Sequence, residues 1–556
     1  MKFLMLWLSF WSCLGLSATR APVYGTKGMV ASVSPIASEV GADILRQGGT
    51  AADAAVAVGL ALAVTWPSAG NLGGGGFALV HAGESPDTFI DYRETAPAAA
   101  GPDFYLNAQG ELKEKESRVG YRAAGVPGTV AGLALLHKKW GKLPWKTLVE
   151  PARRLADKGF IVDAALEESL WSSRELLLLY PETQKIFFNK GKPWKRGDRL
   201  VQKDLAASLA LIQRHGSDGF YKGKLADLIT SDMKANNGVL SKADLSGFKV
   251  AEREPVRRKW REFEVVTAPP PSSGGIVLLS ILGMLENDKI EAMGAGSADY
   301  LHLLIESMKK AFADRSVWIG DPAFVNNPVT KLLDPTYIAK RRAAITDKAA
   351  HDVMPGELPG ESPDTTHFTI RDSKGMTISN TYTLNGSYGS GVVAKGTGIL
   401  MNNEMDDFTS KLGSNNMFGL KQGARNLIAP GKRPLSSMTP TFVYKGKDLI
   451  LALGAPGGPT IINSVTQTII NRLVFHMDIQ EAADAPRFHH QWMPDKILWE
   501  PHGLNPDTKK LLDLKGHVFR ETPRSFGDIQ ALAWDEENGR WTGGSDSRNG
   551  GAVVAE

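Results

Sequence analysis

Cysteine is almost absent from this 556-residue sequence, and the single one, Cys13, lies close to the N-terminus. Without cysteine in the body of the chain there can be no disulfide framework, no zinc–thiolate centre and no thiol nucleophile. The fold must therefore be held by its apolar core, for which this length and a hydrophobic content of 42% are sufficient.

An excess of charge of one sign is also missing. Lysine and arginine number 64 against 60 aspartate and glutamate, giving a formal net charge of +4. Basic residues occur in short groups, such as Lys138-Lys139, and form no stripe along a predicted element. This distribution is typical of solvated surface and predicts no nucleic-acid partner.

No hydrophobic run is long enough for a typical membrane span, and one of the two longest lies at the start of the chain. Met1-Lys2 is followed by an apolar run from Phe3 to Leu16 and by the small residues Ser17-Ala18. This order predicts a secretory signal over residues 1–18, too short for a permanent anchor, and hence a periplasmic or secreted protein. A buried N-terminal helix is the alternative, and a lipid anchor at Cys13 is disfavoured by the bulky residues before it.

Two helices are predicted after this segment. Ser34-Pro35 has the form of an N-cap followed by proline at the first helical position, and Gly48-Gly49 ends that helix. Thr50 with Asp53 resembles a capping box for a second helix. The apolar stretch 54–64 that follows has eleven residues by number, too few to span a membrane, so we expect a buried helix and no membrane anchor.

The glycine run 70–76 precedes the predicted strand 77–80. A phosphate-binding loop follows a strand and opens a helix, so the reversed order favours a close backbone crossing instead. Residues 125–342 are predicted to be mostly helical, and the proline-rich segment 269–275 is interpreted as a rigid loop before a helix. Strand patterns dominate from Thr365 onward, which predicts a layered α+β fold.

A threonine-rich hairpin begins at Thr365. Asp372 opens the predicted turn and Gly375 supplies its left-handed residue. If Asp372 faces Met376, Thr365 lies opposite Thr383, where cross-strand hydroxyls can hydrogen-bond. By itself, such a hairpin is commonly only a surface ladder of β-branched residues.

The sequence around this hairpin resembles the start of the small subunit of γ-glutamyltranspeptidases, and further motifs similar to that family extend through nearly the whole chain. They are the segments 70–76, 91–97, 269–275, 402–408, 433–438 and 455–458. The resemblance implies a four-layer αββα sandwich of the N-terminal nucleophile hydrolase type. It further implies self-cleavage between Asp364 and Thr365, giving a large subunit, 19–364, and a small subunit, 365–556, that form one structural domain.

The chemistry of this family requires a threonine at the start of a chain. A hydroxyl is a weak nucleophile that needs a nearby base, and a free α-amino group has a pKa of about 7.7–8.0. Cleavage before Thr365 would place that amine on the nucleophile itself, and Thr383 would orient it. The resulting acyl-enzyme would be attacked by water or by an amino-acid or dipeptide acceptor.

The resemblance also implies a site for a γ-glutamyl group, whose carboxylate and ammonium need opposite charges. Arg93 would bind the carboxylate with Ser436 and Ser437, as the planar guanidinium matches a carboxylate. The ammonium would lie against Asp407, Glu404 and Asn385, and the N–H groups of Gly457 and Gly458 would form the oxyanion hole. No cofactor and no metal are expected.

Each of these residues has a simpler interpretation when taken alone. Arg93 could form a surface ion pair, and Glu404, Asp406 and Asp407 could form a solvated turn or a weak calcium site, although the spacing lacks the usual calcium-loop alternation. His489-His490 suggests a metal pair, but adjacent side chains diverge, so a structural role is favoured. The complementary groups together make the site.

Two departures from the family pattern stand out. Phe418 takes the place of a lid tyrosine that some bacterial relatives carry in the segment 413–431, and Pro459-Thr460 follows the glycine pair where many relatives have serine and arginine. The leading hypothesis is a γ-glutamyltransferase and glutathione hydrolase. The alternatives are a cephalosporin or glutaryl acylase of the same family and a non-catalytic exported binding protein.

Overall fold

The computed structural model of the protein describes residues 19–113, 115–354, 366–420 and 423–556. The predicted secretory signal, the proposed cleavage bond and Thr365 lie outside the described residues. Among those described, no helix combines the length and the apolar character needed to cross a membrane.

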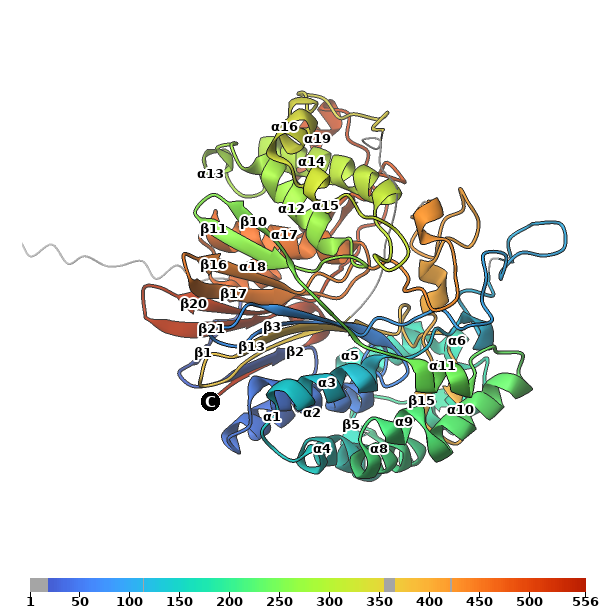
Figure 1. Ribbon diagram of the computed structural model, residues 1–556. Coiled ribbons are helices and arrows are strands. Elements are labelled where there is room, and N and C mark those ends of the chain that lie inside the picture. Colours follow the sequence, from blue (N-terminus) through green and yellow to red (C-terminus); the bar gives the residue numbers. More distant parts are fainter. Residues whose placement is uncertain (1–18, 114, 355–365, 421–422) are drawn as a thin grey trace, which may run out of the picture.

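Two seven-stranded antiparallel sheets lie face to face at the centre of the molecule (Figure 1). In spatial order, the first sheet contains β1 (Val23–Gly25), β21 (Arg540–Ser545), β20 (Gln530–Asp535), β17 (Asp448–Gly454), β16 (Thr441–Lys445), β11 (Phe263–Thr267) and β10 (Val256–Trp260). The second contains β22 (Ala552–Ala555), β2 (Met29–Ser32), β12 (Thr366–Arg371), β13 (Thr377–Thr383), β3 (Gly75–His81), β4 (Thr88–Asp91) and β9 (Ala251–Arg253).

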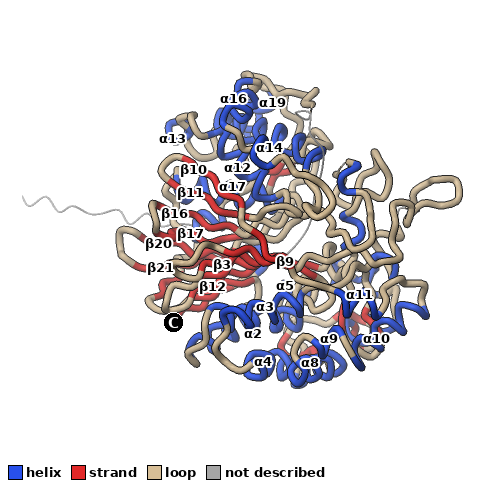
Figure 2. The backbone as a smooth tube through the Cα atoms, in the orientation of Figure 1, coloured by secondary structure: helices blue, strands red, loops and turns tan. Residues whose placement is uncertain are grey.

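Helices cover the outer face of each sheet, so that the layers run helix, sheet, sheet, helix (Figure 2). The second sheet is covered by α1 (Pro35–Arg46), α2 (Ala51–Thr65) and α3 (Thr129–Trp140), with α4 (Trp145–Lys158) and α8 (Lys203–His215) behind them. The first sheet is covered by α12 (Gly274–Leu285), α17 (Thr460–Leu473) and α18 (Ile479–Asp484), with α14 (Ala298–Trp318) packed on the outer side of α12. The expected αββα sandwich is confirmed.

Each sheet mixes strands from before and after residue 365. In the second sheet, β12 pairs with β2 on one side and with β13 on the other, and β13 pairs with β3. In the first sheet, β16 lies between β11 and β17. Both halves of the chain therefore contribute strands to each sheet.

The local signals in the N-terminal third act as expected. The Ser34 hydroxyl accepts a hydrogen bond from the amide of Ala37, and the Thr50–Asp53 capping box begins α2. All fifteen residues of α2 are buried, because the helix lies between its neighbouring helices and the sheet. A uniformly apolar helix of this length is therefore a core element of the sandwich.

The glycine run is a close backbone crossing, as expected. A Cβ atom at Gly73 would collide with the Leu400 carbonyl, and one at Gly74 with the Thr383 carbonyl. Asn71 fixes the same crossing, since its Nδ2 donates to the Thr383 carbonyl at 2.8 Å. Only glycine lets β3 enter the sheet this close to the end of β13.

Candidate active site

The β12–β13 hairpin has the predicted register. Thr366 pairs with Tyr382 and Arg371 with Thr377, while the amide of Asp372 donates to the Met376 carbonyl at 3.0 Å. Gly375 has a φ of +91°, which supplies the left-handed turn residue. Thr365 itself lies outside the described residues, so its position opposite Thr383 stays a prediction.

Polar groups gather at the open end of this hairpin. The Thr383 hydroxyl accepts a hydrogen bond from the amide of Asn385 at 2.7 Å, and Asn385 itself has a φ of +75°. The Asn385 Nδ2 donates to the Asn403 carbonyl at 2.9 Å, and its Oδ1 is buried with no hydrogen-bond partner among the described residues. Asn385 thus presents an unused acceptor just beyond the end of β13.

A cavity of about 730 Å³ opens at the same place. Its lining includes Thr366, Asn385 and Gly457, together with Glu168 of α5 (Ala164–Ser172) and Arg548. The side chain of Thr366 is 1% exposed, and its hydroxyl has no partner among the described residues. The end of β12 therefore faces a space large enough for a small peptide.

Gly457 and Gly458 form the turn between β17 and α17, with φ values of +128° and +62°. Within the described part of the chain, neither N–H group donates a hydrogen bond to protein. The Thr460 hydroxyl donates to the Gly457 carbonyl at 2.5 Å. This gives the unusual Thr460 a role: it fixes the orientation of the peptide unit that follows Gly457.

Arg93 lies at the centre of a buried ionic cluster. Its Nη1 pairs with Glu404 and its Nη2 with Asp407, and all three side chains are 0% exposed. Glu404 and Asp407 share one side of the short 3₁₀ turn Glu404–Asp407, because side chains three residues apart are eclipsed in that geometry. The structure thus brings together the residues expected to bind the two ends of the substrate zwitterion.

Glu94 is a member of this cluster that sequence reasoning missed. Its Oε2 lies 3.8 Å from Arg93 Nη1, and its side chain has no exposed surface. Burial, and then repulsion by Glu404, raises the pKa of Glu94 well above its ordinary value. The Arg-Glu pair in the segment 91–97 was visible in the sequence, but only the fold shows that both side chains point inward.

The cluster has more acidic groups than one arginine can neutralise. Burial raises the pKa of Glu404 and of Asp407, and the Glu404 charge raises that of Asp407 further. Burial lowers the pKa of Arg93, but the carboxyl groups around it outweigh that effect and raise it. The site is consequently an arginine kept charged beside carboxyl groups that readily hold a proton.

Ser436 and Ser437 come directly after the two residues whose carbonyl groups accept hydrogen bonds from Arg93. The Arg93 Nε donates to the Pro434 carbonyl at 3.3 Å and its Nη2 to the Leu435 carbonyl at 3.0 Å. The Ser437 hydroxyl accepts a hydrogen bond from Arg315 of α14 at 3.0 Å. Arg315 is a second buried cation near the proposed carboxylate pocket, and no local sequence signal pointed to it.

The lid segment 413–431 lies against the same polar groups in its described part. The Met417 sulfur is 3.9 Å from Asn385 Nδ2, and the Phe418 carbonyl accepts a hydrogen bond from Gln491 at 3.1 Å. Asp406 points toward the lid, because it accepts hydrogen bonds from the Met417 amide at 2.8 Å and from Ser117 at 2.6 Å. The acidic trio therefore divides into two inward groups and one that fastens the lid.

His489 and His490 are hydrogen-bonded at every ring nitrogen. His489 contacts Asn463 at 2.7 Å and Gln491 at 3.0 Å. His490 contacts Asp495 at 3.0 Å and the Trp492 amide at 3.1 Å. These bonds support the structural interpretation, and the described residues contain no group of three or more potential ligands that could hold a metal ion.

In the described structure, Arg93 is closed off from the cavity. The cavity lining includes Asn385 and Gly457 but none of the buried ionic cluster. The two are joined through Asn385, which bonds to the Asn403 carbonyl immediately before Glu404. The cavity and the buried ionic cluster therefore lie on either side of Asn385.

Known proteins match nearly the whole chain. The family model described as Gamma-glutamyltranspeptidase matches residues 37–556. A glutathione hydrolase proenzyme of Pseudomonas sp. (strain A14) is 47% identical over 93% of this chain and 90% of its own length. The glutathione hydrolase proenzyme of Escherichia coli (strain K12) is 45% identical over 95% and 91%, respectively. Acylase ACY 1 proenzyme of Pseudomonas sp. (strain V22) is 37% identical over 96% and 95%.

Solved structures give the same result for the fold. Cephalosporin acylase from Bacillus halodurans superposes with a TM-score of 0.87 at 28% identity, covering 98% of both chains. A chain of Helicobacter pylori γ-glutamyltranspeptidase superposes with a TM-score of 0.57 at 43% identity, covering 58% of this chain and 94% of that one. From the matching family model and the extent of these similarities, the chain belongs to the γ-glutamyltranspeptidase family.

Proposed function

We propose that this protein is a γ-glutamyltransferase and glutathione hydrolase. The observation that carries the proposal is the buried pairing of Arg93 with Glu404 and Asp407, a cluster that Asn385 links to the end of the β12–β13 hairpin. A cation and anions held together inside the protein complement a zwitterion, and the γ-glutamyl group carries one at its α-carbon. The substrate's carboxylate would pair with Arg93 and its ammonium with Glu404 and Asp407, in place of the contacts that these residues make with each other.

The reaction starts at Thr365. Its hydroxyl attacks the γ-amide carbon while its own α-amine takes the proton, and Thr383 orients that amine. The N–H groups of Gly457 and Gly458 bind the oxyanion, and Thr460 holds their turn in place. The proton then passes to the departing amine, leaving a γ-glutamyl ester on Thr365 that water or an acceptor amine attacks.

The processed enzyme would consist of a large subunit, 19–364, and a small subunit, 365–556. The support is chemical, because the catalytic amine does not exist until the bond before Thr365 is cut. The mixed strands of both sheets explain how the two pieces would stay together after cleavage. Export to the periplasm or the cell exterior, directed by residues 1–18, belongs to the same proposal.

The acylase alternative is supported by the similarity to acylase ACY 1 proenzyme. An acylase for glutaryl side chains has no ammonium to bind, so it does not need buried carboxylates facing the arginine. Glu404 and Asp407 in contact with Arg93 favour a γ-glutamyl substrate. Burying these carboxyl groups costs desolvation free energy, and an acylase substrate without an ammonium would not compensate for that cost.

The test is an assay of glutamate release from glutathione by the purified, processed protein, with and without a dipeptide acceptor. We expect release in buffer and a new γ-glutamyl dipeptide when the acceptor is added. The Thr365→Ala protein serves as the control and should give neither product. Turnover of glutaryl amides with no activity on glutathione would overturn the proposal in favour of an acylase.

A further inference from the structure

A second hollow, larger than the active-site cavity, lies at the opposite end of β12. Its volume is about 880 Å³, and it opens among the hairpin ends of both sheets and the C-terminal end of α17. Thr366 begins β12 beside the active-site cavity, whereas Arg371 ends the strand in this hollow. At about 3.3 Å per residue, the two cavities are separated by roughly 17 Å of strand.

The floor of the hollow is apolar and includes large rings. Phe263 and Leu449 are 8% and 9% exposed, and the half-buried Trp534 and Trp541 have ring centroids 6.1 Å apart. The two ring planes are inclined at 61°, so a flat apolar group can stack on one ring and meet the other by its edge. Nothing in the proposed γ-glutamyl chemistry uses these residues.

The wall and rim carry an excess of positive charge. Five cationic side chains line the hollow against three carboxylates, Glu262, Asp448 and Glu536, giving a net charge of +2 with the histidines neutral (5 − 3). Lys445 is paired with Glu536 at 2.9 Å. Among the described residues, the other four cations form no ion pair with a carboxylate: Arg371, Lys374, Lys447 and Arg472.

Arg371 is the best-placed of these cations. Its guanidinium lies 4.3 Å from the ring centroid of Trp541 and donates to the Gly375 carbonyl at 2.7 Å and to the Thr377 hydroxyl at 2.8 Å. Its neighbour Asp372 gives its oxygens to the backbone amides of Ala51, Lys374 and Met376 instead. Burial lowers the pKa of Arg371, as expected for a partly desolvated cation.

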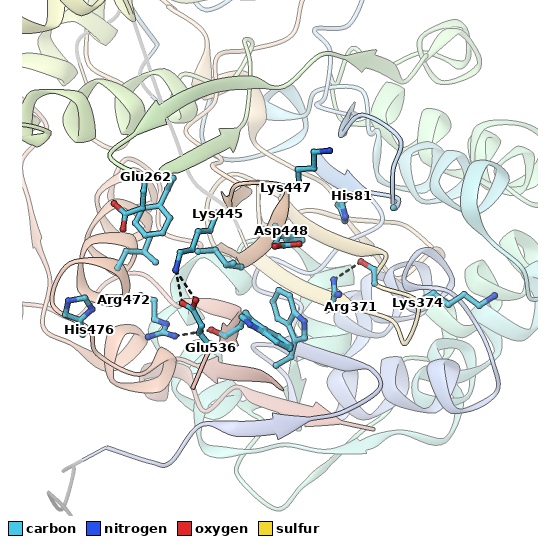
Figure 3. Close-up of a pocket in the computed structure, with 18 residues that line it drawn as sticks. His81, Glu262, Arg371, Lys374, Lys445, Lys447, Asp448, Arg472, His476 and Glu536 are labelled. Atoms are coloured by element: carbon cyan, nitrogen blue, oxygen red, sulfur yellow. Dashed lines mark hydrogen bonds and ion pairs between the residues drawn. The ribbon is translucent and has the colours of Figure 1, made fainter. Parts of the chain in front are cut away.

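Lys374 and Lys447 extend from the β12–β13 and β16–β17 hairpins at the rim (Figure 3). Arg472, on the other side of the hollow, donates to the carbonyls of Met477 and Trp534, at 3.3 and 3.1 Å. The cations are therefore distributed around the aromatic floor, and two of them are held by backbone acceptors that do not neutralise them.

We infer that this hollow is a binding site, separate from the active site, for a small organic anion with a flat aromatic body. The ring system would lie on the Trp534–Trp541 surface, and the acidic group would pair with Arg371 and the rim lysines. The anion would pair directly with the half-buried guanidinium, which forms no ion pair with any carboxylate in the described part of the chain. Charge-assisted hydrogen bonds to such a group are the strong class of polar contact.

The test uses naphthalene-2-sulfonate as the probe and 2-naphthalenemethanol as its neutral partner of similar shape. Isothermal titration of the processed enzyme, with both subunits present, should give saturable binding of one sulfonate per molecule and at least tenfold weaker binding of the alcohol. Equal binding of the two probes, or no saturable binding of the sulfonate at millimolar concentration, would overturn the proposal.

Variants locate the bound probe. Lys374→Glu combined with Lys447→Glu should weaken sulfonate binding at least tenfold, and Arg371→Gln should do the same. Lys138→Glu, on exposed surface of α3 outside the hollow, is the matched control and should leave binding unchanged. The rim variants sit on exposed turns, so they test the site even where Arg371→Gln fails to fold.

An inhibition assay distinguishes binding in this hollow from binding in the active site. The sulfonate should not compete with a γ-glutamyl anilide, because the two cavities lie at opposite ends of β12. Competitive inhibition with an affinity that the rim variants do not alter would place the probe in the catalytic cavity and overturn the assignment.

Discussion

The Arg93 guanidinium donates a hydrogen bond to the Asp407 carboxylate, and neither side chain has any exposed surface. Two groups expected to bind opposite ends of a substrate are thus bound to each other. A buried ion pair of this kind is strongly destabilised when one partner is lost, because the other charge remains without compensation. Specificity and stability are therefore linked at this pair.

Arg93→Lys should harm binding more than a conservative change normally does. Lysine keeps the charge but cannot contact Glu404 and Asp407 through two separate nitrogens of a planar group. We expect KM for a γ-glutamyl anilide to rise and kcat/KM to fall about tenfold or more, given roughly 1.5–3 kcal/mol for a charge-assisted hydrogen bond. Arg118→Lys, at a 33%-exposed side chain paired with Asp406, is the control. An unchanged KM in Arg93→Lys would remove Arg93 from the pocket.

Asp407→Asn should shift the choice between γ-glutamyl and glutaryl substrates, which differ only in the α-ammonium. A site built to pair a charge rejects an analogue without it, because its own carboxylate is left unpaired. The variant should lose γ-glutamyl activity steeply, still self-cleave, and gain relative activity on glutaryl anilide. The measurement is the ratio of the two kcat/KM values for the processed enzymes.

Asp406→Asn is the matched control for that experiment. Asp406 is one residue away but bonds to Ser117 and to the Met417 amide, so the substrate ratio should stay at the wild-type value. If Asp407→Asn also keeps the wild-type ratio, Asp407 is not the ammonium partner.

Self-cleavage should occur between Asp364 and Thr365, giving a small fragment of 192 residues (556 − 364). Thr365→Ala should remain full length and inactive, because it lacks the attacking hydroxyl. Thr366→Ala is the control and should still be cut, since the Thr366 hydroxyl has no partner among the described residues. Mass spectrometry of the small fragment checks the site, and a fragment beginning elsewhere contradicts it.

Thr460→Val should lower kcat with little change in KM. Valine has the shape of threonine without the hydroxyl that holds the Gly457 carbonyl, so the oxyanion turn loses a constraint that matters in the transition state. The loss of one hydrogen bond, about 0.5–1.5 kcal/mol, predicts a fall of up to roughly tenfold. Thr460→Ser keeps the hydroxyl and should retain most activity. A rise in KM at constant kcat would instead place Thr460 in substrate binding.

Buried histidines should make the protein less stable in mild acid. His302 Nε2 contacts the Thr346 carbonyl at 2.8 Å, so its Nδ1 accepts from His517 Nε2 at 2.8 Å. Burial lowers the pKa of His302, that of His517 to about 3 and that of His490 to about 4. Around them, Lys309 pairs with Asp495 at 2.9 Å.

These histidine side chains bind protons more weakly in the folded protein than in the unfolded chain. Their full contribution to folding stability is therefore present only above the unfolded pKa of about 6.5, where they are neutral in both states. The contribution of these histidines to stability should fall as the pH decreases from about 6.5 toward 4, by about 3 kcal/mol for a residue such as His490. In His490→Gln, which keeps a donor for Asp495, melting temperature should depend less on pH over this range. An identical pH dependence in wild type and variant would show that His490 does not titrate on unfolding.

Local sequence patterns determined much of what the structure contains. The caps at Ser34 and Thr50 and the turn at Asp372–Gly375 depend on hydrogen bonds between residues close in sequence, so they could be predicted from the residues themselves. The hairpin register followed from the turn. The resemblance then supplied the αββα fold, because many motifs occurred in the family's order.

Only the tertiary structure decided how distant residues meet. Arg93 contacts Glu404 and Asp407 more than three hundred residues away because β4 and the 404–407 turn end at the same place in the fold. The same is true of Glu94 in that cluster, of Arg315 behind Ser437, and of the cations gathered at the far end of β12. Side-chain direction and burial set these contacts, and both depend on the packing of layers rather than on any local pattern.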